Sequence, residues 1–461
     1  MGWLLAFVLL SVLILFHEFG HFLLAKINGV EVEEFSLGFG PRLFSVVKGG
    51  TRYSLKLLFF GGACVMKGMV QDEEDADGDN DASASDEDNQ VSEGIGRHDQ
   101  RRHLTKGDGS FQSVSLGGRA SIVVAGPLFN FILAFIGAII VISLVGYDPS
   151  TVLYVDPESS AAEAGLQEGD LITGFNGHPI VIGRDMTAEL MFHEPEAGKT
   201  IEMKISRDGQ SQVISFTPDT YELYRMGISY AVGDGVAEVL SVVEGSPIAN
   251  AGITAGDIIL EVNDEPIASG DALNAYFESH PLDGSELKMV YLHGNKERTA
   301  YLTPVMTPVT EIGFRYNLYR EKTGSLATIK YSAYEVWYWI RTTVQSVGRL
   351  FSGQGSLDDL SGPVGVADLV EDTYEDAKPA GTGMVFLNLL NLLVFLSADL
   401  GVMNLLPIPG VDGGRLLFII IEAVRRKPVD RKIQGTIELI TVMLLLALMM
   451  LVLYNDILRL F

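Results

Sequence analysis

The stretch Phe7-Val-Leu-Leu-Ser-Val-Leu-Ile-Leu-Phe16-His17-Glu18-Phe19-Gly20-His21-Phe-Leu-Leu-Ala25 places two histidines and a glutamate inside an apolar run. A run of this length and composition predicts a membrane-spanning helix. Ionisable side chains are costly at membrane depth, so their presence indicates a functional site. Because positions i and i+4 share a helix face, His17 and His21 can bind one metal ion, and Glu18 can reach a water molecule beside it. The alternative is a pair of packed polar histidines, which the apolar surroundings disfavour.

Composition extends this view to the whole chain of 461 residues. With 47% hydrophobic residues, it suits a membrane protein that carries a large soluble part. Spanning a bilayer takes about 20 apolar residues. Four segments meet this requirement, namely Trp3–Ala25, Ala120–Val145, Met384–Leu406 and Ile437–Tyr454. The first lacks the basic start and small-residue cleavage site of a signal peptide, so we expect it to remain as a helix.

Basic residues predict the orientation, because cytosolic loops are enriched in lysine and arginine. They cluster in three short loops, at 26–67, 97–119 and 415–432. We therefore expect these loops in the cytosol, and both termini and the segment 147–380 outside it.

Cys64 is the single cysteine. It can form no internal disulfide, and a packed thiol is favoured over a sulfur ligand.

The formal net charge of −26 is unevenly distributed, and no nucleic-acid partner is expected. Much of the charge lies in Asp72–Asp88, whose composition predicts a disordered, solvated loop. Asp77, Asp79 and Asp81 have part of the spacing of a calcium loop. The glycine and the closing glutamate of such a loop are missing, which argues against calcium binding.

The segment between the second and third apolar runs contains an internal repeat. Residues 159–180 (Ser-Ser-Ala-Ala-Glu-Ala-Gly-Leu-Gln-Glu-Gly-Asp…Asn-Gly-His-Pro-Ile) recur 87 residues later as 246–267. Each copy predicts a short helix, a Gly-Asp turn, a strand, a second turn and another strand, followed by a helix. The pattern resembles tandem PDZ domains of the bacterial type. That resemblance implies capture of an extended peptide along a sheet edge, although the two domains could also be simple spacers.

A second polar site interrupts the third apolar run, in Asn404-Leu-Leu-Pro407-Ile-Pro409-Gly410-Val-Asp412-Gly-Gly. Prolines and glycines break a helix here, and broken backbone at membrane depth is tolerated where it is packed or lines a cavity. Asp412 is therefore a candidate third ligand, which would complete the two-histidine, one-carboxylate set of an open catalytic zinc site. Taken alone, it could equally cap the helix that starts near Arg415.

Taken in order, the motifs make the chain resemble the bacterial site-2 protease family of the RseP type. The matching motifs are 17–21, 35–40, Gly126-Pro-Leu-Phe-Asn130, the two PDZ-like repeats, Gly362-Pro-Val-Gly365 and 404–414. The resemblance implies an intramembrane zinc endopeptidase that cuts transmembrane segments of single-pass proteins after a first protease has shortened them. It implies that His17, His21 and Asp412 hold Zn²⁺, that Glu18 is the general base and that Asn404 helps to position substrate. The stretch 53–66 departs from the family's usual hairpin sequence, and 71–93 looks like an insertion.

The expected fold class is therefore a multi-span α-helical membrane protein with about four transmembrane helices and two α+β PDZ-like domains between helices 2 and 3. We expect an N-terminal membrane core at 1–146, PDZ-like domains at 147–232 and 233–310, an aromatic interfacial linker at 311–381, and a C-terminal membrane core at 382–461. The resemblance implies that the protein lies in the bacterial inner membrane, with its active site near the cytosolic side. A catalytically silent PDZ-bearing scaffold and a transporter are the rival functions. The sequence predicts neither the substrate's identity nor the oligomeric state.

Overall fold

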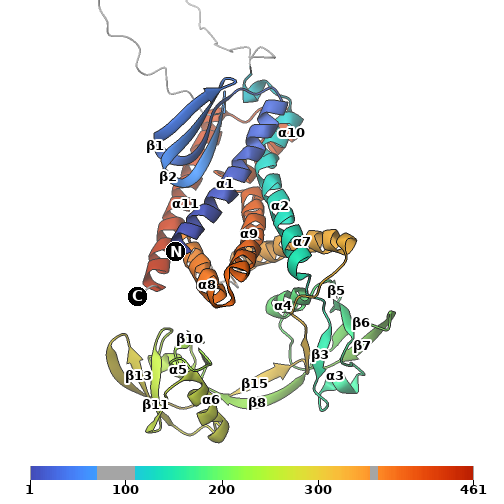
Figure 1. Cartoon of the computed structure of the whole chain (residues 1–461), viewed down its shortest axis with the longest axis vertical. Helices are drawn as coiled ribbons and strands as arrows, with labels where there is room; N and C mark the ends of the chain where they lie inside the picture. Colours follow the sequence, from blue (N-terminus) through green and yellow to red (C-terminus); the bar gives the residue numbers. More distant parts are fainter. Residues whose placement is uncertain (1, 70–108, 354–361, 460–461) are drawn as a thin grey trace, which may run out of the picture. The chain divides into compact units, whose positions relative to one another are not determined.

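The computed structural model describes residues 2–69, 109–353 and 362–459. The acidic stretch Asp72–Asp88, with its partial calcium spacing, lies outside these residues. The chain divides into two compact units, which are Met1–Tyr147 with Tyr319–Phe461, and Asp148–Leu318. Figure 1 shows the first unit as mainly helical and the second as mainly β-structure.

Helices dominate the first unit because its apolar runs leave the backbone no polar partner except itself. Among the described residues, four helical segments are long and apolar enough to cross a membrane: Gly2–Ile27, Leu116–Val145, Thr382–Leu405 and Lys432–Leu453. They coincide with the four expected runs. The helices of this unit are α1 (Gly2–Ile27), η2 (Phe111–Ser113), α2 (Leu116–Val145), α7 (Ser325–Phe351), α8 (Pro363–Ala377), η4 (Lys378–Ala380), α9 (Thr382–Leu405), α10 (Asp412–Arg425) and α11 (Arg431–Arg459).

Small residues let α1, α2 and α9 pack closely. Ala134 and Ala138 of α2 are fully buried against Val394 and Ala398 of α9. Gly20 of α1 lies so close to α2 that a Cβ atom there would come within 2.4 Å of the Ala125 carbonyl oxygen. Close backbone approach of this kind is how helices associate in lipid.

The aromatic cluster expected near the membrane surface lies on α7. Tyr331 stacks on Tyr147 with ring centroids 3.6 Å apart, and Trp339 packs on Phe395. Trp337, in contrast, is 56% exposed. Some rings of the cluster therefore join the helical core, while Trp337 is largely exposed.

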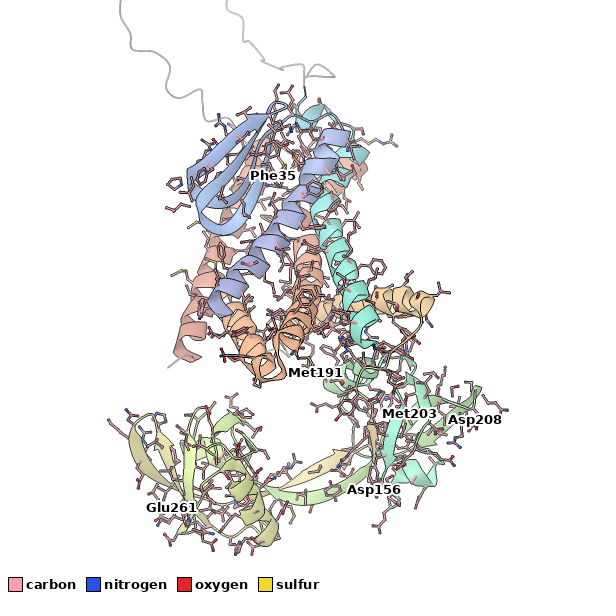
Figure 2. All side chains as sticks on the ribbon, in the orientation of Figure 1. Phe35, Asp156, Met191, Met203, Asp208 and Glu261 are labelled. Atoms are coloured by element: carbon pink, nitrogen blue, oxygen red, sulfur yellow. The ribbon has the colours of Figure 1, made fainter. Side chains whose placement is uncertain are left out.

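A long hairpin, β1 (Val32–Lys48) with β2 (Thr51–Met66), lies beside α1. It is bent upon itself, since residues 34–37 pair with 62–65 on one side and with 52–55 on the other. Phe35, labelled in Figure 2, fixes this sheet to α1 through the rings of Phe22 and Tyr53. The segment 62–65 has 34–37 as its partner within the described residues, so its other side is a sheet edge.

The second unit contains two β modules of the same pattern. The first module consists of β3 (Val152–Val155), α3 (Ser160–Glu163), β4 (Leu171–Phe175), β5 (His178–Pro179), α4 (Gly183–Phe192), β6 (Ile201–Arg207), β7 (Gln210–Phe216) and β16 (Phe314–Tyr316). The second consists of β9 (Ile228–Tyr230), β10 (Val239–Val242), α5 (Pro247–Asn250), β11 (Ile258–Val262), β12 (Glu265–Pro266), α6 (Gly270–Ser279), β13 (Leu287–His293) and β14 (Lys296–Leu302). The four-stranded orders β5-β4-β6-β7 and β12-β11-β13-β14 are equivalent, as the repeat predicts.

The boundaries of the modules differ from the expected division of the chain. β9 falls in the range 147–232 that was expected to be the first domain, yet it pairs with β10 of the second module. β16 falls in the range 311–381 that was expected to be a linker, yet it pairs with β3, and Phe314 belongs to the core of the first module. A two-stranded ribbon of β8 (Asp219–Arg225) and β15 (Val305–Glu311) connects the modules. The second module is therefore inserted before the last strand of the first, so that β3 and β16 pair although they lie about 160 residues apart in the sequence.

Candidate metal centre

Three of the expected site residues come together in the helical unit. His17 and His21 lie one turn apart on α1, and both are buried. The chain breaks at Pro407 and Pro409 after α9, and Asp412 becomes the first residue of α10, also buried. The break places its carboxylate opposite the two imidazoles.

The donor atoms form a small triangle. His17 Nε2 and His21 Nε2 are 3.2 Å apart, and Asp412 Oδ2 lies 3.1 Å and 3.0 Å from them. Two ligands of a tetrahedral zinc ion, with bonds of about 2.0–2.1 Å, lie roughly 3.3 Å apart. The spacing therefore fits three ligands on one zinc ion, with the fourth position left for water or substrate.

The opposite nitrogens of the two imidazoles support this fit. His21 Nδ1 lies 2.8 Å from the Ile122 carbonyl oxygen, an acceptor that can only take the Nδ1 proton. In a neutral imidazole, Nε2 then carries the lone pair that a metal requires. His17 Nδ1 contacts the side-chain amide of the fully buried Asn130 on α2. Both rings are thus oriented by α2.

Gly126 allows α2 to approach this closely. A Cβ atom at Gly126 would lie 2.3 Å from His21 Nε2 and 2.8 Å from His17 Cε1. Any larger residue would displace the imidazoles from the triangle. Sequence reasoning quoted Gly126 and Asn130 as part of a motif but gave neither a role.

Glu18 lies beside the histidines and faces the hairpin. It is partly exposed, and Gly62 of β2 packs against it so closely that a Cβ atom there would be 3.0 Å from Glu18 Cγ. The glycine lets the sheet edge 62–65 reach the carboxylate. Glu18 therefore has access both to the metal-binding triangle and to anything bound along that edge.

Asn404, also expected at the site, is on the last turn of α9. Its side-chain nitrogen donates to the Leu400 carbonyl oxygen at 3.0 Å. Among the described residues, no hydrogen bond joins it to His17, His21 or Asp412.

Cys64 is not one of the converging donors in the described part of the chain. Burial, reinforced by the nearby Glu18 carboxylate, raises the pKa of its thiol to about 12. It is therefore a packed, protonated thiol at neutral pH.

Comparison with known proteins gives three findings. The model of peptidase family M50 matches residues 5–448. The zinc metalloprotease RasP of Bacillus licheniformis is 31% identical over 476 residues, which cover 100% of both chains. The regulator of sigma-E protease RseP of Salmonella typhimurium is 29% identical over 485 residues, covering 99% of this chain and 98% of that protein.

Among solved structures, the HtrA3 PDZ domain bound to a phage-derived ligand aligns with 20% of this chain and 93% of that chain. The sequence identity is 20% and the TM-score is 0.17. That score is too low to support an argument about the fold of either module.

Proposed function

This chain belongs to peptidase family M50, and on that premise we propose that it is an intramembrane zinc endopeptidase that cuts transmembrane segments of single-pass membrane proteins. The peptidase class and the zinc requirement follow from the family and from its relatives, which are zinc metalloproteases by name. The substrate class, the residue roles and the orientation are the proposal.

The observation that carries the proposal is the triangle of His17 Nε2, His21 Nε2 and Asp412 Oδ2. These donors come from α1 and from the start of α10, which follows the candidate span α9. A zinc site in such a place acts on peptide bonds that lie inside the membrane. We assign His17, His21 and Asp412 as the zinc ligands.

Glu18 is the general base in this scheme. A zinc ion held by the triangle supplies Lewis acidity to the scissile carbonyl and to the attacking water. The Glu18 carboxylate takes the proton from that water and passes it to the leaving amide nitrogen. Its partial exposure gives it access to water, and the missing side chain at Gly62 leaves room for Glu18 Cγ beside the neighbouring strand.

The sheet edge 62–65 is the proposed substrate cradle. A transmembrane helix hides its peptide bonds in internal hydrogen bonds, so it must unwind before it can be cut. The free edge next to Glu18 offers main-chain partners to the unwound segment, as in strand addition. Asn404, near the end of α9, is proposed to position that segment.

The two β modules are proposed to lie outside the cytosol and to act as a size filter, in keeping with a second cut in regulated intramembrane proteolysis. Basic residues around α1, α2 and α10 support an active site near the cytosolic face of a bacterial inner membrane. Release of an anti-sigma factor or of a signal-peptide remnant would fit this position. Two relatives carry names that refer to the regulation of sigma factors, which supports the proposal of an anti-sigma factor as substrate.

A catalytically silent PDZ-bearing scaffold is the alternative, and one experiment separates the two. Purified wild type and Glu18→Gln are compared for cleavage of a single-pass reporter in detergent micelles and for zinc content. We expect Glu18→Gln to lose about 10²- to 10⁴-fold in rate while keeping its zinc. Glu33→Gln, an exposed position on β1, is the control. A wild type that holds zinc but cuts no single-span substrate would favour the scaffold, and a fully active Glu18→Gln protein would end the mechanism.

A further inference from the structure

A second group of metal-ligand side chains lies in the first β module. His178 belongs to β5, Glu189 to α4, and His193 is the residue that caps the C-terminus of α4. Glu189 Oε1 lies 2.7 Å from His178 Nδ1 and 3.2 Å from His193 Nδ1. The three donor atoms all lie within 4.8 Å of one another.

Burial and exposure are divided among the three in a way that suits a binding site. The Glu189 carboxylate is buried, with 7% of the side chain exposed, whereas the two histidine side chains are 50% and 47% exposed. A buried carboxylate needs a positive partner. The half-exposed rings leave an open side through which an ion and its water ligands can enter.

The helix that carries this group is fixed independently of it. Asp185 accepts hydrogen bonds from the backbone N–H groups of Val181 and Ile182, and Met186 is fully buried in the module core. Met191, between Glu189 and His193, marks the end of this helix in Figure 2. The donors are therefore held on a rigid element, which reduces the ordering cost of binding an ion.

The second module shows that this fold does not require the three side chains. At the equivalent positions, 87 residues later, it has Glu265, Tyr276 and His280. There the His280 ring stacks on Tyr276 with centroids 4.6 Å apart, and Tyr276 is part of the apolar core. His280 caps its helix as His193 does, through a backbone N–H bond to the residue four positions earlier. Each module thus has an imidazole at this corner, whereas the full set of three donors is found in the first module.

We propose that His178, Glu189 and His193 form a divalent transition-metal site, separate in its ligands from the donors on α1 and α10. Two imidazoles and one carboxylate are borderline donors that suit Zn²⁺, Ni²⁺ or Cu²⁺ rather than Ca²⁺ or Mg²⁺. The ion would link β5 to the end of α4.

The test is a metal count on the full chain in detergent micelles. Each protein is stripped with a chelator, dialysed against buffered zinc and analysed for zinc per chain. We expect the double variant His178→Ala/His193→Ala to bind one equivalent fewer than the wild type, and His280→Ala to bind as many as the wild type. Because the readout is a difference, it holds whether or not the donors on α1 and α10 bind zinc as proposed.

Equal zinc content in the wild type and the double variant would overturn the proposal. A matching loss in His280→Ala would overturn it as well, because it would indicate unspecific binding to surface histidines. If the double variant does not elute as a folded protein, Glu189→Gln takes its place. This change keeps the size of the side chain and removes its charge, and the same loss of one equivalent is expected.

Discussion

The side-chain amide of Asn130 lies 3.1 Å from Nδ1 of His17, on the side of the ring opposite the donor triangle. Asn130 Oδ1 has no hydrogen-bond partner among the residues that the structure describes. A half-turn of the amide exchanges its nitrogen and oxygen, so that Oδ1 accepts the Nδ1 proton of the metal-binding tautomer. If His17 binds zinc as proposed, metal loading and the satisfaction of this buried oxygen should be linked.

Asn130→Ala is expected to weaken zinc binding by about 10- to 100-fold, the usual effect of removing the partner of a ligating histidine. Competition with a chromophoric chelator measures the affinity. Asn28→Ala, which removes an asparagine side chain that donates to the Leu24 carbonyl oxygen, is the control. Unchanged affinity in Asn130→Ala would mean that the orientation of His17 does not depend on this contact.

Loss of a ligand should be distinguishable from loss of the base. His17→Ala and Asp412→Ala are each expected to lose most zinc and all cleavage, because two donors remain of three. Glu18→Gln should keep its zinc, because Glu18 serves the water rather than the metal. Elemental analysis of the purified variants makes the comparison, and full zinc occupancy in Asp412→Ala would remove Asp412 from the ligand set.

Gly62→Val should block cleavage without removing zinc. A Cβ atom at Gly62 would already lie 2.9 Å from Ile14 Cγ2 and 3.0 Å from Glu18 Cγ, so a branched side chain must push the sheet edge away. Successive side chains of a strand point to opposite faces. Ala63→Val therefore places a valine side chain on the other face and is the control. Equal cleavage by the two variants would count against the proposed cradle.

The hairpin of β1 and β2 should lose protection from hydrogen exchange in acid. The Arg42 guanidinium, with help from Ser54 and Lys56, lowers the pKa of Glu34 from 4.5 to about 2. A depressed carboxyl pKa stabilises the fold fully above about pH 4.5, and this contribution is lost as the pH falls toward 2. The protection factors of β1 and β2, taken relative to the intrinsic exchange rates at each pH, should therefore fall across that window in the wild type. In Glu34→Gln these protection factors should already be lower at neutral pH and lack that step, whereas the exposed Glu33→Gln should follow the wild type.

Loosening a β module should change substrate selection. Asp170 is buried and forms an ion pair with Arg207 at 2.7 Å. Removing the Asp170 carboxylate leaves Arg207, whose side chain is 26% exposed, and the backbone N–H of Gln167 without this partner, so the module is expected to loosen. If the modules filter by size, Asp170→Ala should begin to cut substrates with a folded ectodomain and cut shortened ones at an unchanged rate.

Asp208→Ala, an exposed change in the same module, is the control for this comparison (Figure 2). Slower cutting of shortened substrates, with no gain on intact ones, would instead favour delivery of the substrate by a peptide groove. Slower cutting of both forms would refute the filter.

Much of the site could be predicted because its signals are local or strongly patterned. The i, i+4 histidines, the long apolar runs and the broken segment before Asp412 each have a physical meaning in the sequence. Asn130 and Gly126 could not be assigned in this way. Their roles depend on how α2 packs against α1, and helix pairing leaves no periodic pattern that identifies which residues meet.

The β modules show the same limit. The repeat predicted equivalent sheets, but β16 lies outside the repeated segments 159–180 and 246–267. A signal did exist, because Gly313 before Phe314 corresponds to Gly227 before Ile228. In both cases a Cβ atom would collide with a serine, Ser159 or Ser246, that begins a short helix. Extending the comparison to this Gly-apolar pair would have assigned β16 to the first module.

The nested order of the modules has a consequence for biosynthesis. A ribosome makes the chain from its N-terminus, and β16 emerges only after every strand of the second module has been made. The second module can therefore fold first. Until β16 is made, β3 lacks this partner strand and the core of the first module lacks Phe314. Nascent chains whose part outside the ribosomal exit tunnel ends between residues 303 and 312 should hold a finished second module and an unfinished first one, the reverse of the order in which the two begin.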